Sequence, residues 1–583
     1  MLKTRYVVAT IGLLIIIFIA VMFFLPDLQV EKATKGNTYT ESVFDQSKVT
    51  TVNITLADED LDSILDNPSE KEIVDADVTI DGETVKNVGF RTKGNLSLNS
   101  VVQMGDSDRY SWKIDFDYYQ EDQDLHGLKK LALNNNYSDP TYMREYLSYE
   151  LMDKMGIATP GHSYMYVTIN GKEWGLYLGV EAIEETFLNT NFTEGTGDLY
   201  YPDGTGSDLK WISEDIDDYT GINLKTNDHS DQSAMIKMLD AINNGGNLEE
   251  VLNVDEMLRY FAANTALVNL DHYQGDKKHN YYLYEENGVF SILPWDYNMS
   301  FGGYSGGGGR QAGAFDQENN NEGNEVAADQ KDEATAKSND DTAKQDDKEL
   351  LGEAPNKNGG RMMDMSSNFM NESNINFSIT EPVSGTTLEE RPLLNALLSK
   401  DEYREKYYDY LDDIAKDFFS EENMTAMTTE ITTLITPYVK KDPTKFYTMD
   451  EYTEATSGEE TLVDFASQRA ESILAQLSGD LVVEAETESS MGGGAPDMGD
   501  DANDGQQPPN MGGGENGDAA MQPPDMDRDG NGAPPGINGN MGQKGTGNSG
   551  SSKDTIILSS VLLFLLFGAM AFAHFFKRRG KKG

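Results

Sequence analysis

The stretch Tyr164–Val180, YMYVTINGKEWGLYLGV, decides how the first part of this chain folds. Two runs rich in apolar and β-branched residues flank Asn170-Gly171, and Asn-Gly between such runs is the strongest short-range signal of a β-hairpin. The stretch therefore predicts two antiparallel strands, at 164–169 and 173–180, that are joined by a tight turn.

The residues upstream of this hairpin also indicate short strands. They are predicted at 49–56, 78–80, 85–90, 112–116 and 131–133. One helix interrupts them, because Asp139 is suited to the N-cap, Pro140 to the first turn, and Gly156 to the C-terminal end. The chain up to Val180 is therefore predicted to form a sheet with one central helix.

The second half of the chain has mainly helical patterns. Apolar positions over 254–268 trace one face of a helix, and 388–482 is helical as well. A strand pair at 281–284 and 289–293 turns at Asn287-Gly288. A β-rich part followed by a helix-rich part predicts an α+β fold with a cleft between the two parts.

The chain of 583 residues is strongly acidic, with 46 Lys and Arg against 100 Asp and Glu and a formal net charge of −54. Proteins that bind nucleic acids neutralise phosphates with Lys and Arg, so this balance argues against a nucleic-acid partner and favours a basic one. The sequence has no cysteine, which excludes disulfides, thiolate zinc sites and a cysteine nucleophile.

Two long apolar runs predict transmembrane helices. Residues 6–25 carry no charge and follow a basic N-terminus, residues 1–5, while 555–576 precede the basic tail 577–583. Basic flanks predict a two-pass protein of the cell membrane, with both termini cytoplasmic and the large middle part extracytoplasmic. The alternatives are a cleaved signal peptide for the first run and a buried core helix for either run.

Two other segments have too few apolar residues to build a core. Residues 303–376 consist largely of Gly, Asn, Asp, Lys and Glu, and 483–553 are rich in Gly, Pro, Asp and Met. Such compositions are typical of disorder, so we expect an acidic insert and a flexible stalk. The predicted folded core then occupies 40–302 and 377–482.

Three polar residues lie at the ends of predicted elements. Asp271 follows a helix, Asn280 begins a strand and Asp296 follows the next strand. In protein kinases a loop Asp orients the acceptor hydroxyl, while an Asn and a second Asp hold metal ions. Asp271 and Asn280 are nine residues apart, against about five in kinases, and Asp276 could replace the Asn. The alternative is that Asp271 caps a helix and Asp296 lies in a polar turn.

Several short motifs occur in order along the chain. They are Phe90-Arg91-Thr92-Lys93-Gly94-Asn95, Lys113-Ile114-Asp115-Phe116, Leu133-Asn134-Asn135, Met143-Arg144-Glu145, Asn170–Tyr177 with Glu181, Asn280–Tyr284, Pro294-Trp295-Asp296 and Arg391–Leu394. In this order they resemble the CotH family, named for a bacterial spore coat protein, whose members include atypical secreted protein kinases. The resemblance covers 49–302 and, more loosely, 385–482.

The resemblance implies an atypical protein-kinase-like fold of two lobes, between the two transmembrane helices. A β-rich N-lobe is expected over about 40–185, and a helical C-lobe is expected to begin over 190–302. The resemblance also implies ATP and Mg²⁺ or Mn²⁺ as cofactors.

The resemblance assigns roles to the matching residues. Asp271 would be the catalytic Asp, with Asp296 as a metal ligand and Asn280 as a second one. The implied nucleotide-binding residues are Lys113, which Glu145 or Glu150 would orient, a phosphate-facing loop with Arg91, Lys93 and Asn95, and Glu181. Asn298 stands where the family often has Asp, which removes one possible metal charge.

Together with the two predicted anchors, the resemblance implies a membrane-anchored kinase that phosphorylates Ser or Thr of cell-envelope or spore-coat proteins. We expect a basic, Ser/Thr-rich protein substrate, because the acidic chain would attract it. Two alternatives stay open. One is a non-catalytic surface scaffold on the same fold, and the other is a hydrolase that uses Asp271 and Asp296 as paired carboxylates.

Overall fold

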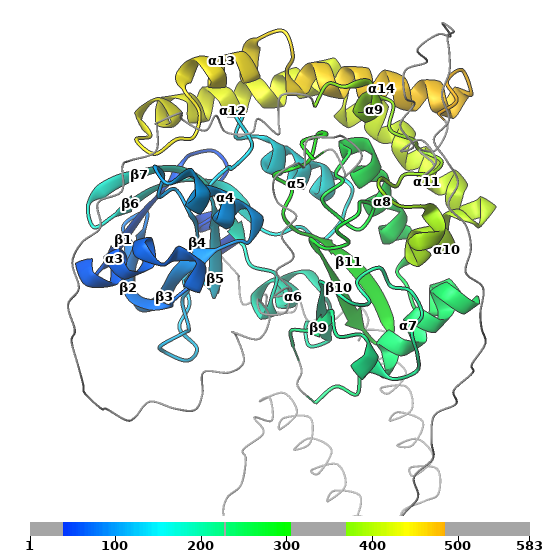
Figure 1. Cartoon of the computed structure of the whole chain (residues 1–583), viewed down its shortest axis with the longest axis horizontal. Coiled ribbons are helices and arrows are strands. Elements are labelled where there is room, and N and C mark those ends of the chain that lie inside the picture. The colour runs from blue at the N-terminus through cyan, green and yellow to red at the C-terminus, as the bar shows by residue number, and fades with distance from the viewer. Residues whose placement is uncertain (1–38, 227–228, 305–368, 484–583) are drawn as a thin grey trace, which may run out of the picture. The chain divides into compact units, whose positions relative to one another are not determined.

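The computed structural model describes residues 39–226, 229–304 and 369–483. Their strands form two separate sheets, and most helices follow the first sheet in the chain (Figure 1). The described α-helices are α2 Tyr39–Ser42, α3 Asp58–Asp66, α4 Leu96–Met104, α5 Arg144–Lys154, α6 Glu185–Asn191, α7 Ser233–Asn244, α8 Val254–Leu267, α9 Glu372–Ile375, α10 Pro392–Leu398, α11 Asp401–Asp413, α12 Glu421–Lys441, α13 Met449–Ser457 and α14 Leu462–Ser478.

The first sheet is a closed barrel with the strand order β1-β2-β3-β4-β5-β7-β6. Its strands are β1 Thr50–Leu56, β2 Val74–Ile80, β3 Glu83–Lys93, β4 Ser111–Asp115, β5 Lys130–Asn134, β6 His162–Ile169 and β7 Lys172–Glu181. Neighbouring strands are antiparallel except β1 and β6, which pair in parallel with Thr50 opposite Met165. This parallel pair closes the barrel.

The hairpin predicted around Asn170-Gly171 is confirmed as β6 and β7. The φ angles of these two turn residues are 49° and 75°, and such positive values at both positions define the turn that Asn-Gly favours. The predicted strands upstream are confirmed as β1 to β5. The predicted central helix is α5, but it begins at Arg144 rather than next to Asp139.

Large apolar side chains fill the interior of the barrel. Phe90 and Trp112 stack there with ring centres 4.9 Å apart, and Trp174 lies edge-on to Trp112 at 6.2 Å. Because the interior is a packed core, the charged residues of β3, β4 and β5 lie on the outer surface of the barrel.

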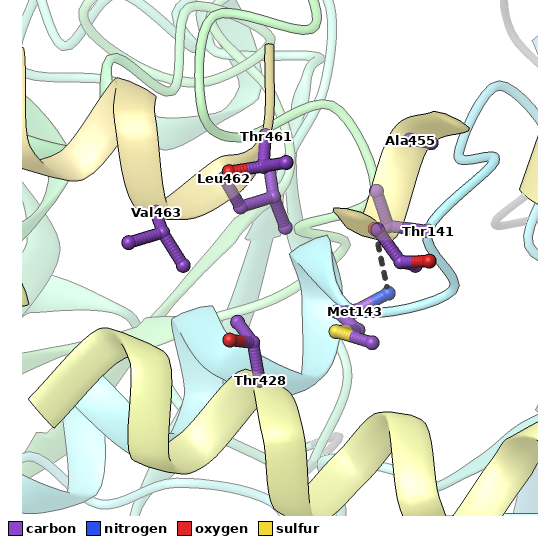
Figure 2. Close-up of a pocket in the computed structure, with 8 residues that line it drawn as sticks. Thr141, Met143, Thr428, Ala455, Thr461, Leu462 and Val463 are labelled. Atoms are coloured by element: carbon purple, nitrogen blue, oxygen red, sulfur yellow. Dashed lines mark hydrogen bonds between the residues drawn. The ribbon is translucent and has the colours of Figure 1, made fainter. Parts of the chain in front are cut away.

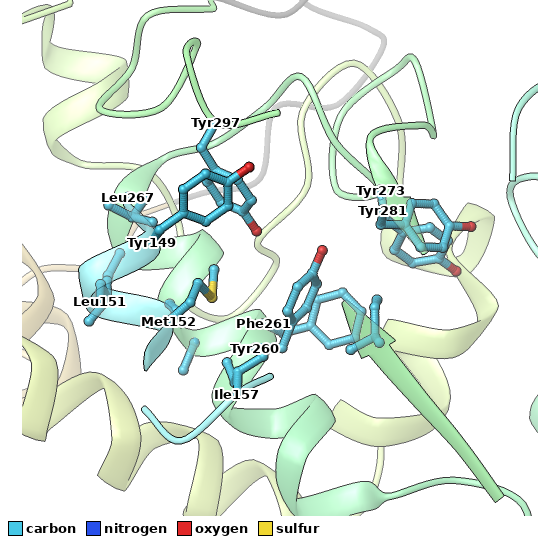
Figure 3. Close-up of a cluster of buried hydrophobic side chains, with 14 of the residues drawn as sticks. Tyr149, Leu151, Met152, Ile157, Tyr260, Phe261, Leu267, Tyr273, Tyr281 and Tyr297 are labelled. Atoms are coloured by element: carbon cyan, nitrogen blue, oxygen red, sulfur yellow. The ribbon is translucent and has the colours of Figure 1, made fainter. Parts of the chain in front are cut away.

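The second sheet has the strand order β11-β10-β8-β9. Its strands are β8 Asp198–Pro202, β9 Ile222–Leu224, β10 Tyr281–Glu286 and β11 Val289–Pro294. A core rich in tyrosine lies beside it (Figure 3): Tyr149 of α5 packs 5.6 Å from Tyr297, and Tyr273 packs 5.5 Å from Tyr281. The first contact joins α5 to the chain that follows β11, and the second joins the loop after α8 to β10.

Helix α8 lies in the middle of this larger core. Every residue of α8 is buried except Asp255 and Arg259. The sequence predicted one apolar face, whereas the helix is enclosed on several sides because α5, α11, α14 and β11 pack around it. Its burial fixes the position of the loop that follows, which carries Asp271.

A buried ion pair joins the barrel to the C-terminal helices. Arg109, which is fully buried before β4, donates from Nη1 to Asp442 Oδ2 at 2.9 Å, just beyond α12. The same carboxylate oxygen accepts the amide of Leu176 in β7 at 2.8 Å. Gly175 has a φ of 119°, and a Cβ there would collide with the Asp442 carboxylate. The end of α12 is therefore fixed against β7.

The predicted kinase-like two-lobe fold with two flanking transmembrane helices is wrong. The β-rich part is a closed barrel of seven strands, because its first strand, β1, pairs with β6. A second, separate sheet follows the barrel in the chain.

The two predicted transmembrane segments, 6–25 and 555–576, lie outside the described residues. Within the described ranges no helix is both long and apolar enough to cross a membrane. At 21 residues α12 has the length, but it contains several threonines and has charged residues at both ends. The predicted membrane anchoring and two-pass localisation are corrected on this finding.

The predicted insert and stalk lie mostly outside the described residues, so their boundaries stay predictions. Helix α9 falls within the last part of the range predicted for the insert.

Candidate active site

The outer face of the barrel presents a group of cations. Arg91 of β3 lies opposite Lys113 of β4, and Lys113 lies opposite Ala132 of β5. Residues that face each other across neighbouring strands point to the same side of the sheet. Since Trp112 and Ile114 point into the barrel and are fully buried, Arg91 and Lys113 lie side by side on the outer face.

A chain of hydrogen bonds links this face to α5. Lys93 at the end of β3 donates from Nζ to Asn134 Oδ1 at 2.6 Å. The amide nitrogen of Asn134 donates to both carboxylate oxygens of Glu145, at 3.0 and 2.9 Å. Tyr149, one turn further along α5, donates to Glu145 Oε1 at 3.1 Å. The predicted residues Lys93 and Glu145 are thus brought together through Asn134.

Asp296 approaches the same helix from the second sheet. Its backbone amide donates to the Tyr149 hydroxyl at 3.3 Å, and its φ of 61° is uncommon outside glycine. Burial and the negative charge of Asp296 raise the pKa of Glu145, whereas the charge of Lys93 opposes this rise. Glu145 therefore lies within electrostatic reach of a barrel cation and of the acid that follows β11.

Asp271 is buried in the loop after α8, and both of its carboxylate oxygens accept hydrogen bonds. His279 Nε2 lies 2.9 Å from Oδ1, and Asn280 Nδ2 donates to Oδ2 at 3.2 Å. The same Asn280 nitrogen also donates to the Asp271 carbonyl at 3.0 Å. The predicted pair Asp271 and Asn280 is therefore in direct contact through the side-chain nitrogen of Asn280. The side-chain oxygen of Asn280, Oδ1, takes no part in this contact.

His279 is a residue that the sequence analysis missed, although it directly precedes Asn280. Burial is the largest single effect on His279 and lowers its pKa, whereas the hydrogen bond to Asp271 and the negative charge of Asp271 raise it. The negative charges of Asp203 and Asp296 act in the same direction, and the pKa ends above its ordinary value of 6.5. The imidazole thus lies among the carboxylates of Asp203, Asp271 and Asp296, which places the predicted catalytic Asp271 and the predicted metal ligand Asp296 in one region.

Other predicted residues lie elsewhere. Asn95 precedes α4 and accepts a hydrogen bond from Lys71 Nζ at 3.0 Å. Glu181 is buried, and its carboxylate accepts hydrogen bonds from the Tyr39 hydroxyl at 2.6 Å and from the Gly161 backbone amide at 3.0 Å. Neither bond of Glu181 leads to the group around Glu145.

The alternative residues also have partners of their own. Glu150 accepts from His162 Nε2 at 3.1 Å if that nitrogen carries the proton. Asp276 accepts the Tyr304 hydroxyl at 3.2 Å. Asn298, where the family often has Asp, donates to the Tyr137 carbonyl at 3.4 Å.

The oxygen donors of the site suit a hard divalent cation. Within the described ranges no group of three or more His, Asp or Glu side chains is arranged to hold a metal. Carboxylate and amide oxygens are nevertheless the ligands that Mg²⁺ prefers, and Asp296 and the Asn280 carbonyl supply both kinds. Three carboxylates around one imidazole also leave a negative charge that a cation would balance.

A separate small pocket lies where α12, α13 and α14 meet the chain before α5 (Figure 2). It is lined by Thr141, Met143, Thr428, Thr461 and Leu462, among others, and its volume is about 10 Å³. A space of this size holds about one water molecule, so this pocket is no substrate site.

Comparison with known proteins identifies the family. The family model described as CotH kinase protein matches residues 90–473. The inner spore coat protein H of Bacillus subtilis (strain 168) is 28% identical over 211 residues, which are 34% of this chain and 56% of that protein. The inner spore coat protein H-like protein of the same organism is 32% identical over 92 residues, 16% of this chain and 28% of that protein. The chain thus spans about half the length or less of these relatives. Because the family model covers well over half of the chain, this protein belongs to the CotH kinase protein family.

Proposed function

We propose that this chain is a protein kinase that transfers the terminal phosphate of ATP to Ser or Thr hydroxyls of another protein. The family description supports this reaction class. The observation that carries the proposal is the environment of Glu145, which lies within electrostatic reach of Lys93 from the barrel and of Asp296 from the second sheet. A cation for phosphate and an acid for a metal are thereby held at one helix.

Asp271 is proposed to orient the acceptor hydroxyl and to accept its proton. The hydroxyl oxygen forms a bond to the terminal phosphorus, the bond from that phosphorus to the bridging oxygen breaks, and ADP leaves. Asp271 suits this role because His279 and Asn280 fix both of its oxygens.

The phosphates are proposed to lie on the outer face of the barrel. Arg91, Lys93 and Lys113 would supply positive charge there, and Glu145 would hold Lys93 in place through Asn134. A Mg²⁺ or Mn²⁺ ion, when bound by Asp296 and the Asn280 carbonyl, supplies charge neutralisation for the phosphates.

The proposed substrate is a basic protein rich in Ser and Thr, as a component of a spore coat or cell envelope. The names of the two Bacillus relatives support a coat protein. The net charge of −54 supports a basic partner, because opposite charge speeds encounter.

The test uses the purified full chain with labelled ATP, Mg²⁺ or Mn²⁺, and a basic Ser/Thr-rich protein. We expect phosphate transfer by the wild type and a loss of at least about 100-fold in Asp271→Asn and in Asp296→Asn. Asp122→Asn is the matched control, since Asp122 is exposed in the loop between β4 and β5. A folded wild type that neither binds ATP nor transfers phosphate would contradict the proposal and leave the non-catalytic scaffold as the function.

A further inference from the structure

The structure describes buried arginines whose surroundings differ. In three of them the guanidinium donates several hydrogen bonds. Arg109 donates to Asp442, to Thr444 and to the carbonyls of Asn135 and Leu176. Arg391 donates to the carbonyls of Tyr273, Glu390 and Gly275, and Arg469 to those of Ile375, Phe377 and Thr265. A guanidinium has five N–H donors, and these side chains use most of their donor groups.

Arg144, the first residue of α5, makes fewer side-chain hydrogen bonds than these three arginines. It is 1% exposed, yet its side chain makes a single hydrogen bond among the described residues, from Nη1 to the Ser138 carbonyl at 3.2 Å. Its Nε is buried and has no partner among the described residues, as is also true of Arg469 Nε. The ring of Phe369, with its centre 5.3 Å from Cζ, covers part of the guanidinium.

No described carboxylate pairs with this cation. Asp139 is close in sequence, but its Oδ2 accepts the backbone amide of Arg144 at 2.9 Å and its Oδ1 accepts from Thr141. A buried charge is costly unless it is paired and hydrogen-bonded, and a cation–π contact compensates only part of that cost. The unfilled donors therefore indicate an anionic ligand.

The position of Arg144 suits an oxyanion. The planar fork of a guanidinium matches two oxygens of a phosphate group, whereas the first backbone amide of α5 is already capped by the Asp139 carboxylate. On the other side lies Gly303, at which a Cβ would come within 2.5 Å of Arg144 Nη1. Only a residue without a side chain allows the backbone at position 303 to pack this closely against the guanidinium.

We propose that Arg144 is the receptor for a phosphate group between the start of α5 and the chain that follows Asp296. Ser300 already joins these elements, because its hydroxyl contacts Ser148 of α5 at 2.7 Å and donates to the Arg144 carbonyl at 3.3 Å. A phosphate on Arg144 would strengthen this junction directly beside Glu145. The ligand is either free inorganic phosphate or a phosphoryl group esterified to a protein hydroxyl.

The test measures thermal unfolding of the full chain in increasing inorganic phosphate, with chloride at matched ionic strength. For free phosphate we expect a saturable rise of the midpoint in the wild type, no rise in Arg144→Met, and a weakened response in Gly303→Ala, which keeps the charge but displaces the guanidinium. Gly303→Ala also decides the case if Arg144→Met does not fold.

A second arm identifies a phosphoryl group carried by the chain itself. Phosphatase treatment would then lower the midpoint of the wild type, with loss of phosphoryl mass from the intact chain, and would leave Arg144→Met unchanged. The proposal is overturned if wild type and Arg144→Met respond alike to both treatments. It is also overturned if neither treatment changes the wild type. Neither arm needs kinase activity, so this result is independent of the proposed reaction.

Discussion

Asp271 and its neighbours show how single side chains were, or were not, predictable. The placement of Asp271, Asn280 and Asp296 at the ends of elements drew attention to them. His279 carried no such signal, because its importance comes from a contact across the loop that only the folded chain reveals. Asn134 was part of a recognised motif, but its bridge between Lys93 and Glu145 depends on the barrel and α5 meeting.

The contact with His279 leads to a prediction about turnover. His279→Ala frees one oxygen of Asp271, and we expect kcat for phosphate transfer to fall by up to about 100-fold, with a smaller change in KM for ATP. His279→Gln, which keeps a donor, should recover part of the loss. Steady-state kinetics on the full chain measure both constants.

His229→Ala is the matched control for this prediction, because His229 is exposed. Equal kcat values for His279→Ala and the wild type would show that the imidazole does not position Asp271.

The elements were predicted where their pattern is local. The hairpins at Asn170-Gly171 and Asn287-Gly288 were correct because their turns require residues that the sequence displays. Strands β8 and β9 were missed, since β9 has only three residues and is defined by pairing with β8. Helix α5 begins later than predicted because Asp139 accepts the backbone amides of both Thr141 and Arg144, and Tyr142 between them has a left-handed φ of 62°.

The junction between α12 and β7 yields a prediction about stability. Asp442→Ala leaves Arg109 buried without its counterion, and we expect the free energy of unfolding to fall by about 3–5 kcal/mol. The double variant with Arg109→Met should lose less than the sum of the two single variants, because neither charge is then left alone. Denaturant unfolding monitored by circular dichroism measures these values.

Asp412→Ala provides the comparison, since Asp412 near the end of α11 pairs with exposed Lys416, just beyond that helix, at 2.6 Å. Such a surface pair contributes at most about 0.5 kcal/mol. Similar losses for Asp412→Ala and Asp442→Ala would mean that the buried pair does not fix the two elements.

The whole chain carries buried carboxylates that make its stability depend on pH. Burial raises the pKa of Glu181 and of Glu256 from 4.5 to about 7. Between these values the folded chain binds protons that the unfolded chain has released, so the free energy of unfolding falls as pH rises through this window.

We expect Glu181→Gln and Glu256→Gln to reduce this dependence, each by at most about 3 kcal/mol between about pH 4.5 and about pH 7. Denaturant unfolding of the wild type and both variants across this range tests the slope. Parallel curves for all three proteins would show that these carboxylates ionise in the folded chain as they do in the unfolded one.

The architecture of the entire described region was less predictable than its parts. An α+β composition was evident, but the closed barrel was not, because the pairing of β1 with β6 joins segments that local patterns treat independently. The expectation of two kinase-like lobes rested on the family resemblance alone. The chain belongs to that family, but its strands form a closed barrel and a second sheet instead of the expected lobes.

The parallel pair of β1 and β6 has a consequence for the order of folding. The barrel can close only when β1 pairs with β6, which places Thr50 opposite Met165. One edge of β1 therefore stays unpaired while the intervening strands are being synthesised. Distant pairings of this kind slow folding, and an open strand edge invites association with other chains. Closure of the barrel is therefore expected to be a slow step, during which a newly made chain is most exposed to aggregation.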